Sequence, residues 1–461
     1  MGVHETIVIL GLVIGGALAL AGLFRPFLGL LVLIAIHFIQ PGELVPGLNV
    51  ISIERSYAIA LLVVFVLYRL SIPGRPLLSN RLVLASLLLV GSAFLSIPFA
   101  VWRGGAFAQT TELIKNVILL VLIFGLIDAN ARMSKALWVM VGLFAWFAGS
   151  ALIAYAHGQI SLQEGIERAQ GTTSMAGGPN ELAGLILALL PFLIALLRCT
   201  HSILIRLSLL ACGSLGLAAL VLTGARAGML ALILVGAYYV LRSRHQVVWF
   251  VACVALACII WIGMPQDYRD RYLTVKQYAS GGQLDASNEL RLRVWKAGWR
   301  MLLDHPLLGV GAGQFPTAYG TTYAGRAHVA WMNPHNLFLQ VICELGVVGL
   351  IVFIYFVIQI VKQIRYLPRR ESSPLVELNF QVATACGAML IALMAISVVS
   401  HTLYRPYWYL LGGLVAANSR NAWAAFGGEL ATQIGQAVTT PVDSAMQGRE
   451  YELDSASVAE T

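Results

Sequence analysis

The chain has 461 residues, of which 59% are hydrophobic and only 11% are charged, and its mean hydropathy is +0.80. A soluble domain usually carries about 25% charged residues, so this composition excludes an ordinary soluble protein. The net charge of +8 would suggest nucleic-acid binding in a soluble chain, but we expect no nucleic-acid partner here, because basic loops mark the cytoplasmic side of a membrane protein.

Long apolar segments follow one another along the chain. A bilayer core about 30 Å thick needs roughly 20 apolar helical residues to cross it, and these segments lack the alternation of β-barrel strands. About thirteen are predicted, or about twelve if the first two, separated only by Arg25 and Pro26, are one. They cover approximately residues 6–24, 27–40, 57–71, 82–101, 114–128, 136–156, 181–198, 203–222, 227–242, 246–264, 335–361, 377–400 and 403–417. We therefore expect an all-α polytopic membrane protein with about 12 transmembrane helices.

Basic residues gather in every second connection between these segments. The basic connections are 69–81, 132–135, 198–206, 242–245 and 362–370, which the positive-inside rule places in the cytoplasm. The alternate loops, 41–56, 102–113, 157–180, 223–226, 265–334 and 401–405, then face outward. The C-terminus falls inside, and the N-terminus falls outside or inside according to the helix count. The first apolar segment has no clear cleavage site after it, so we expect it to be retained.

Four regions follow from this topology: N-terminal helices (1–264), a large external loop (265–334), C-terminal helices (335–417) and a cytoplasmic tail (418–461). Within the loop, Asn288 to Leu303 has helical spacing, Asp304-His305-Pro306 ends that helix, and GVGAG forms a glycine-rich turn. External loops of this length are usually functional, so we expect the loop to cover a cavity as a lid. The polar, acidic tail is predicted to be disordered.

His335 is the first candidate for chemistry. In Asn333-Pro334-His335-Asn336, Asn333 suits the N-cap of the next helix and Pro334 its first position, which places His335 in the first turn. The helix dipole would lower the pKa of His335, and a neutral imidazole can serve as a general base. The alternative is an interfacial histidine that only helps to cap the helix.

Arg226 is the second candidate, in the tight external turn TGARAG. An arginine at a helix N-terminus beside open backbone N–H groups suits a diphosphate. The alternative is an arginine that snorkels or sets topology, although the positive-inside rule disfavours a basic residue on this side.

Arg291 and Arg293 lie two residues apart in the loop helix, so their side chains point about 200° from each other and only one is expected to face a site. The alternative for either is a solvated charge paired with Glu289 or Asp285. Weaker candidates are Asn180, in the turn GGPNE that opens a helix, and Lys115, which could meet an anionic ligand or a lipid headgroup. Glu344, inside the helix after His335, is expected to form a structural ion pair.

Several kinds of site are missing from the sequence. The external loops contain no DxD or HExxH motif, and the chain contains no P-loop, so neither metal ligands nor an ATPase site is predicted. The six cysteines show no CxxC or metal-ligand spacing, so neither disulfides nor zinc is supported. A transporter for an anionic lipid would show paired repeats and interrupted helices, and the sequence indicates neither.

Four segments in order, GGPNELA, TGARAG, LRVWKAGWRMLLDHPLLGVGAGQF and NPHNLFLQVICELGVVGL, resemble the bacterial O-antigen ligase family over roughly residues 170–355. Its superfamily also contains O-antigen polymerases and protein O-oligosaccharyltransferases. The resemblance implies a glycosyltransferase C-type-like enzyme of the bacterial inner membrane with a periplasmic site. It would transfer glycan, with inversion, from undecaprenyl diphosphate to a lipid A-core hydroxyl, without a metal or other cofactor.

By the same resemblance, Arg226 and Arg291 would bind the diphosphate and His335 would be the base toward the acceptor hydroxyl. Arg293, Asn336, Asn180 and Lys115 are further substrate-binding candidates. Ala225 departs from the family, in which many members have serine before the arginine. The alternatives are a polymerase of carrier-linked glycan, a protein O-oligosaccharyltransferase and, outside the enzymes, a lipid-linked glycan transporter.

Overall fold

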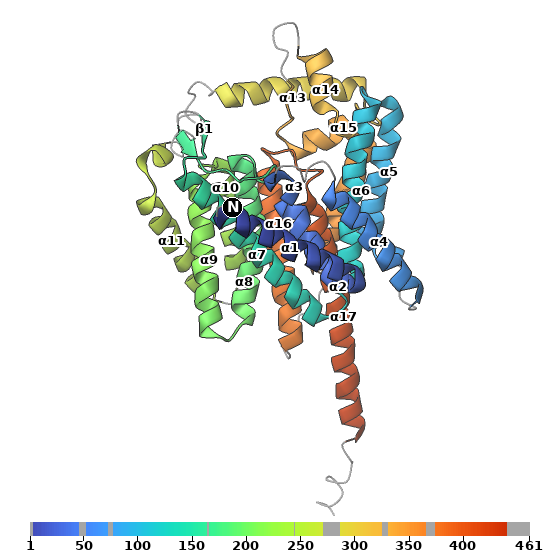
Figure 1. Cartoon of the computed structure of the whole chain (residues 1–461), viewed down its shortest axis with the longest axis vertical. Coiled ribbons are helices and arrows are strands. Elements are labelled where there is room, and N and C mark those ends of the chain that lie inside the picture. The colour runs from blue at the N-terminus through green and yellow to red at the C-terminus, as the bar shows by residue number, and fades with distance from the viewer. Residues whose placement is uncertain are drawn as a thin grey trace, which may run out of the picture.

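The computed structural model describes residues 3–45, 52–71, 77–163, 166–243, 245–270, 286–324, 331–365 and 374–439. Long helices form a bundle, and a layer of shorter elements crosses one of its ends (Figure 1). The N-terminal helices are α1 (Val3–Phe24), α2 (Pro26–Ile39), α3 (Pro41–Leu44), α4 (Ile53–Ser71), α5 (Arg81–Ser96), α6 (Arg103–Leu126), α7 (Asn130–Ala156), α8 (Pro179–Cys199), α9 (Ile203–Leu222), α10 (Arg226–Arg242) and α11 (Gln246–Gly263).

The C-terminal helices are α13 (Ala286–Asp304), α14 (Phe315–Ala318), α15 (Leu337–Arg365), α16 (Pro374–Ser397) and α17 (Pro406–Thr439). Short 3₁₀ turns η2 (Leu77–Ser79) and η3 (Ile97–Phe99) flank α5, and a π-helical turn η4 (Tyr319–Tyr323) follows α14. The strands β1 (Ser161–Gln163) and β2 (Ile166–Arg168) pair antiparallel in a small hairpin that the sequence did not predict.

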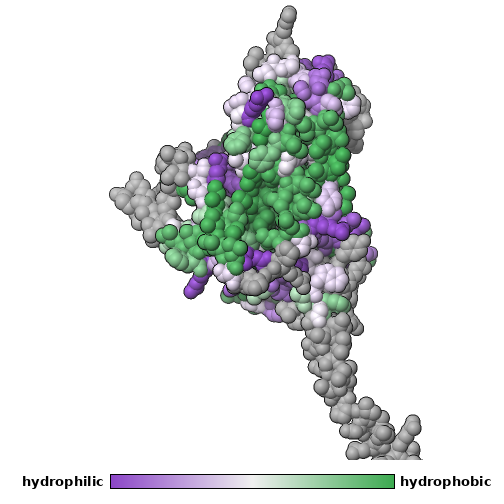
Figure 2. All heavy atoms as spheres, turned by 90° about the vertical axis from the view of Figure 1, so that its right-hand side faces the viewer, coloured by the Kyte–Doolittle hydropathy of each residue, from purple (hydrophilic) through white to green (hydrophobic). Residues whose placement is uncertain are grey.

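Each predicted apolar segment lies on one of these helices, so the protein is an all-α polytopic membrane protein apart from the small hairpin. Eight of the described helices are long and apolar enough to cross a membrane, by length and composition, and two shorter apolar helices precede them. Figure 2 shows the expected surface, a continuous apolar belt with polar residues above and below it. Large apolar side chains such as Leu88 and Leu95 of α5 stay exposed there, as lipid-facing residues do.

The described residues of the predicted basic connections lie at one end of the bundle, as the topology predicted. Arg198, in the last turn of α8, donates to Gln381 of α16, and Arg420 of α17 donates to the carbonyl oxygen of Ile127 after α6. Asn80, before α5, bonds Gln363 near the end of α15. The helix α13 and the glycine-rich turn lie at the opposite end (Figure 1).

The large loop contains the predicted helix, α13, which ends at Asp304 as expected. Its apolar face packs on the start of α15 through Val294, Ala297 and Met301, together with Phe315 and Cys343. The described part of the loop therefore packs onto the membrane helices, as expected, whereas its role as a lid stays a prediction. Residues 271–285 and 325–330 lie outside the described residues.

The helix α15 is broken at Gly346, whose φ of +66° and ψ of −167° are not helical. The glycine-rich turn fills the break: the N–H of Val310 donates to the Cys343 carbonyl oxygen (2.8 Å), and the N–H of Val347 donates to that of Pro306 (2.9 Å). These bonds satisfy backbone groups that a broken membrane helix would otherwise leave unpaired. The expectation that no helix is interrupted is therefore wrong. The sequence of α15 did not indicate the break, because the residues that pair with its backbone there come from the glycine-rich turn.

Three further expectations are corrected. The loop predicted at 102–113 is helical from Arg103, because α6 extends beyond its apolar part. The tail is not disordered throughout, because α17 continues to Thr439, and only 440–461 lies outside the described residues. The third correction concerns the start of α15 and is described with His335 below.

Candidate functional site

A cavity of about 220 Å³ lies beneath α13, at the end of the bundle opposite the basic connections. Four segments that are far apart in the sequence form its wall: residues 178–181 at the start of α8, residues 290–294 of α13, His335, and Val399 after α16. The lining side chains include Asn180, Glu181 and Arg291. The structure thus brings three sequence-predicted residues, Asn180, Arg291 and His335, to one cavity.

Only one of the two loop arginines faces this cavity. Arg291 lines it, whereas Arg293 points away and pairs with Glu289 at 2.6 Å, with both side chains more than half exposed. The divergence of residues two apart on a helix is confirmed, and Arg293 has the solvated, paired role that was its alternative. Arg293 is therefore placed outside the candidate site.

His335 lies just before α15 and not in its first turn. The helix begins at Leu337, and Asn336 is its cap, because the Asn336 side chain accepts the N–H of Leu339 at 2.9 Å. The expectation that Asn333 caps the helix is wrong. The indole of Trp295 holds the Pro334 carbonyl oxygen (3.1 Å), which fixes the chain direction before the helix starts. The side-chain amide of Asn336 also donates to the Val398 carbonyl oxygen, which connects the start of α15 to the turn after α16.

The surroundings of His335 favour a neutral imidazole. Burial lowers the pKa of His335, the positive charge of Arg291 lowers it further, and the carboxylate of Glu181 opposes the shift. Its backbone has a φ of +45°, a left-handed conformation that is uncommon for a residue other than glycine and is often found at functional sites. The first physical cause of the neutral imidazole is therefore burial.

His401 is a residue that the sequence did not indicate. Its ring meets that of His335 edge to face, with 5.6 Å between the ring centroids. Burial, followed by the electrostatic effects of His335 and Arg405, lowers the pKa of His401 to about 3, so this ring is also neutral. His401 lies in the short turn between α16 and α17, where no motif marks it.

Arg226 begins α10 as predicted, with Ala225 at the N-cap and Gly224 in the left-handed region. Arg226 is not among the described residues that line the cavity. Its turn is connected to the cavity by Arg168, a buried residue at the end of β2. Arg168 donates to the carbonyl oxygen of Thr223 (2.6 Å) and to the side-chain oxygen of Asn180 (3.3 Å).

Residues 211–354 match the family described as O-antigen ligase. Over this part of the chain, the protein is therefore similar to the O-antigen ligase family. A Rickettsia conorii protein, named provisionally as a polysaccharide ligase, is 28% identical over 155 residues, which cover 32% of this chain and 33% of that protein. The match thus spans about a third of the relative. Of the residues above, Arg226, Arg291 and His335 lie inside the ligase region, whereas Asn180 and His401 lie outside it.

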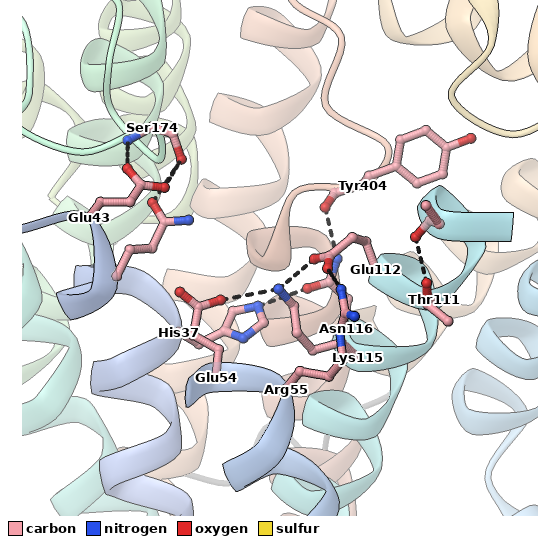
Figure 3. Close-up of polar contacts among 12 residues, drawn as sticks. His37, Glu43, Glu54, Arg55, Thr111, Glu112, Lys115, Asn116, Ser174 and Tyr404 are labelled. Carbon is pink, nitrogen blue, oxygen red and sulfur yellow. Dashed lines mark hydrogen bonds and ion pairs between the residues drawn. The ribbon is translucent and has the colours of Figure 1, made fainter. Parts of the chain in front are cut away.

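Lys115, also outside the ligase region, belongs to a separate charged cluster with Glu54, Arg55 and Glu112 (Figure 3). Its amino group lies 2.5 Å from Glu112 and 3.1 Å from Glu54, and its side chain is 12% exposed. Arg55 pairs with the same Glu112 at 2.7 Å. The cluster lines its own cavity of about 230 Å³. The positive charge of Lys115 is therefore balanced by carboxylates, in a cluster that does not include His335.

The segment that leads to the cavity wall is held in place by polar contacts from α3 and from the turn before α17. Glu43 accepts both the backbone N–H and the hydroxyl of Ser174, each at 2.6 Å (Figure 3). Arg405 donates to the Ser174 carbonyl oxygen at 3.0 Å. These bonds position the chain just before the GGPNE turn, which opens a helix as predicted, since α8 starts at Pro179.

Glu344 accepts hydrogen bonds close to the break in α15 and forms no ion pair within the described part of the chain. Its buried carboxylate accepts the N–H of Gly313 (2.9 Å) and the hydroxyl of Tyr404 (2.7 Å). The expected ion pair is therefore replaced by hydrogen-bond donors from the glycine-rich turn and from the turn after α16, and these stabilise the carboxylate in the apolar interior.

Proposed function

We propose that this chain is a membrane-embedded glycosyltransferase of the O-antigen ligase type. It takes a glycan from undecaprenyl diphosphate and joins it to a sugar hydroxyl of lipid A-core at the periplasmic face of the inner membrane. The observation that supports this most is the cavity in which Arg291 lies beside the neutral imidazole of His335. A cation for a phosphate leaving group and a base for a hydroxyl are the two groups that such a transfer needs.

In this mechanism, the acceptor hydroxyl gives its proton to His335 while its oxygen attacks the anomeric carbon of the donor sugar. The bond from that carbon to the diphosphate oxygen breaks, and the diphosphate leaves with the electron pair. Attack from the face opposite the leaving group inverts the configuration. His335 becomes an imidazolium, which loses its proton to water after the product leaves.

The arginines act on the leaving group. Arg291 faces the cavity, and Arg226 begins a helix whose N-terminal backbone and guanidinium suit a second phosphate. Each positioned stabiliser contributes on the order of 10²–10³ in rate, and a positioned base contributes roughly 10²–10⁴. Together these account for transfer without a metal, so we propose a metal-independent reaction.

The test is reconstitution of the full chain in proteoliposomes with carrier-linked glycan, in the presence or absence of lipid A-core. We expect glycan on lipid A-core, with the same yield in the presence of a chelator. Longer carrier-linked chains without added acceptor would make the protein a polymerase, and glycan on protein would make it an oligosaccharyltransferase. If glycan crosses the bilayer and no glycosidic bond forms, the protein is a transporter and the enzyme proposal fails.

A further inference from the structure

A third cavity opens at the basic end of the bundle, far along the helices from His335. It has a volume of about 860 Å³ and lies where α8, α9, α10, α11 and α16 converge. Three arginines line it: Arg198 from the end of α8, Arg206 from α9 and Arg242 from the end of α10. Neither the ligase family nor the proposed reaction gives these arginines a role.

The positive charge in this cavity exceeds the negative charge. Glu377 is the single carboxylate among the described lining residues, so three guanidiniums face one carboxylate. Glu377 itself accepts the side-chain amide of Gln381 at 2.6 Å. A surplus of two positive charges in a partly buried cavity favours an anion with more than one oxygen acceptor.

Aromatic rings hold two of the arginines in place, and one of these, Arg198, also donates one N–H to Gln381. The guanidinium of Arg198 lies 4.8 Å from the ring centre of Trp249, and that of Arg242 lies 5.5 Å from the ring centre of Phe380. The Nε atom of Arg242 is buried and has no hydrogen-bond partner among the described residues. Such prepositioned guanidiniums lose little freedom when they bind phosphate.

An apolar groove continues from this cavity along the bundle. The groove, of about 650 Å³, runs between α10 and α11 and shares Leu241 with the cavity. Its described lining is almost wholly apolar, from Leu241 and Phe250 at the basic end to Met229 and Met264 at the other. The helix α11 buries none of its residues, so the groove opens directly to the membrane.

We infer that the cavity and the groove together form a binding site for an anionic phospholipid of the leaflet at the basic end. The headgroup phosphate would lie among Arg198, Arg206 and Arg242, and an acyl chain would lie in the groove between α10 and α11. Basic pockets between membrane helices bind anionic headgroups in this way, and the adjoining groove explains why the ligand is a lipid and not a soluble anion. This inference is independent of the proposed function.

The test uses purified full-length protein and native mass spectrometry, with titrations of phosphatidylglycerol, phosphatidylcholine and inorganic phosphate. We expect phosphatidylglycerol to be retained and phosphatidylcholine to be lost. The double variant Arg198→Gln/Arg242→Gln removes two charges and should weaken phosphatidylglycerol binding roughly 30-fold. The control variant Lys135→Gln, which removes an exposed charge at the same end, should change the binding less than about twofold.

A second variant tests the groove without changing any charge. Ala257 lies on the exposed face of α11 and lines the groove, so Ala257→Trp should fill it and lower phosphatidylglycerol retention while leaving the thermal stability of the protein unchanged. Equal retention of both lipids, or unchanged binding by the double arginine variant, would overturn the site. Displacement of phosphatidylglycerol by millimolar phosphate, with no effect of Ala257→Trp, would reduce it to a phosphate site and overturn the lipid assignment.

Discussion

The cavity at His335 and the charged cluster at Lys115 each contain a cation that the sequence indicated as anion-binding, but the neighbours of the two cations differ in charge. The amino group of Lys115 lies between two carboxylates at 2.5 and 3.1 Å. Arg291 instead lies near an imidazole, and its charge helps to lower the pKa of His335. A cation near the membrane surface therefore does not by itself indicate an anion site, because the fold can place it between carboxylates, as it does with Lys115.

The largest difference should come from His335. The change His335→Ala removes the proposed base, and we expect the rate of glycan transfer to fall by roughly 10²–10⁴. Transfer of radiolabelled glycan in proteoliposomes measures this rate, and an unchanged melting temperature in detergent shows that the variant is folded. A His335→Ala protein with the wild-type rate would remove the base assignment.

The two loop arginines provide a matched pair. Arg291→Ala should lower the transfer rate by about 10²–10³, because the diphosphate loses a stabilising cation. Arg293→Ala, two residues away on the exposed face, should change it less than about twofold, since exposed ion pairs contribute little. Equal losses in the two variants would show that the cavity does not select between them.

Lys115 should affect stability and not catalysis. Lys115→Met leaves Glu54 and Glu112 without their shared cation, and we expect a loss of about 1–3 kcal/mol in the free energy of unfolding, because the pairs are partly buried. The transfer rate per folded molecule should stay within about twofold of wild type. Arg55→Gln is the control, since its side chain is 46% exposed and should matter less. A Lys115→Met protein that is stable but inactive would return Lys115 to the substrate site.

The smallest effect is a shift in pH dependence. The Glu181 carboxylate favours the protonated imidazole, so Glu181→Gln should lower the pKa of His335 and let the neutral base persist to lower pH. The acidic limb of kcat/KM against pH should move to lower pH, while Arg291→Gln should move it to higher pH. Shifts in the same direction for both variants would contradict a role for His335 as the titrating base.

The sequence predicted the helices well because apolar periodicity is a local property. It also predicted that Arg291 and Arg293 diverge, since helical geometry alone decides this. It could not place the start of α15, because Asn333 and Asn336 are both suitable caps and the choice depends on the distant indole of Trp295.

The sequence also could not indicate residues of the site that lie in no recognisable motif. Arg168 becomes important only because a small hairpin carries it to Thr223 and Asn180. His401 reaches His335 from a turn at the far end of α16, so the pair is separated in the chain and joined only by the fold.

The broken helix has a consequence for protein engineering. Because backbone groups of the 306–311 turn complete the hydrogen bonding around Gly346, that turn and the first part of α15 form one structural unit. A chimera that grafts the segment of a relative corresponding to residues 265–334 must carry the matching stretch of α15 with it. An exchange of the loop alone would leave unsatisfied amides inside the membrane, and such a hybrid should fail to accumulate.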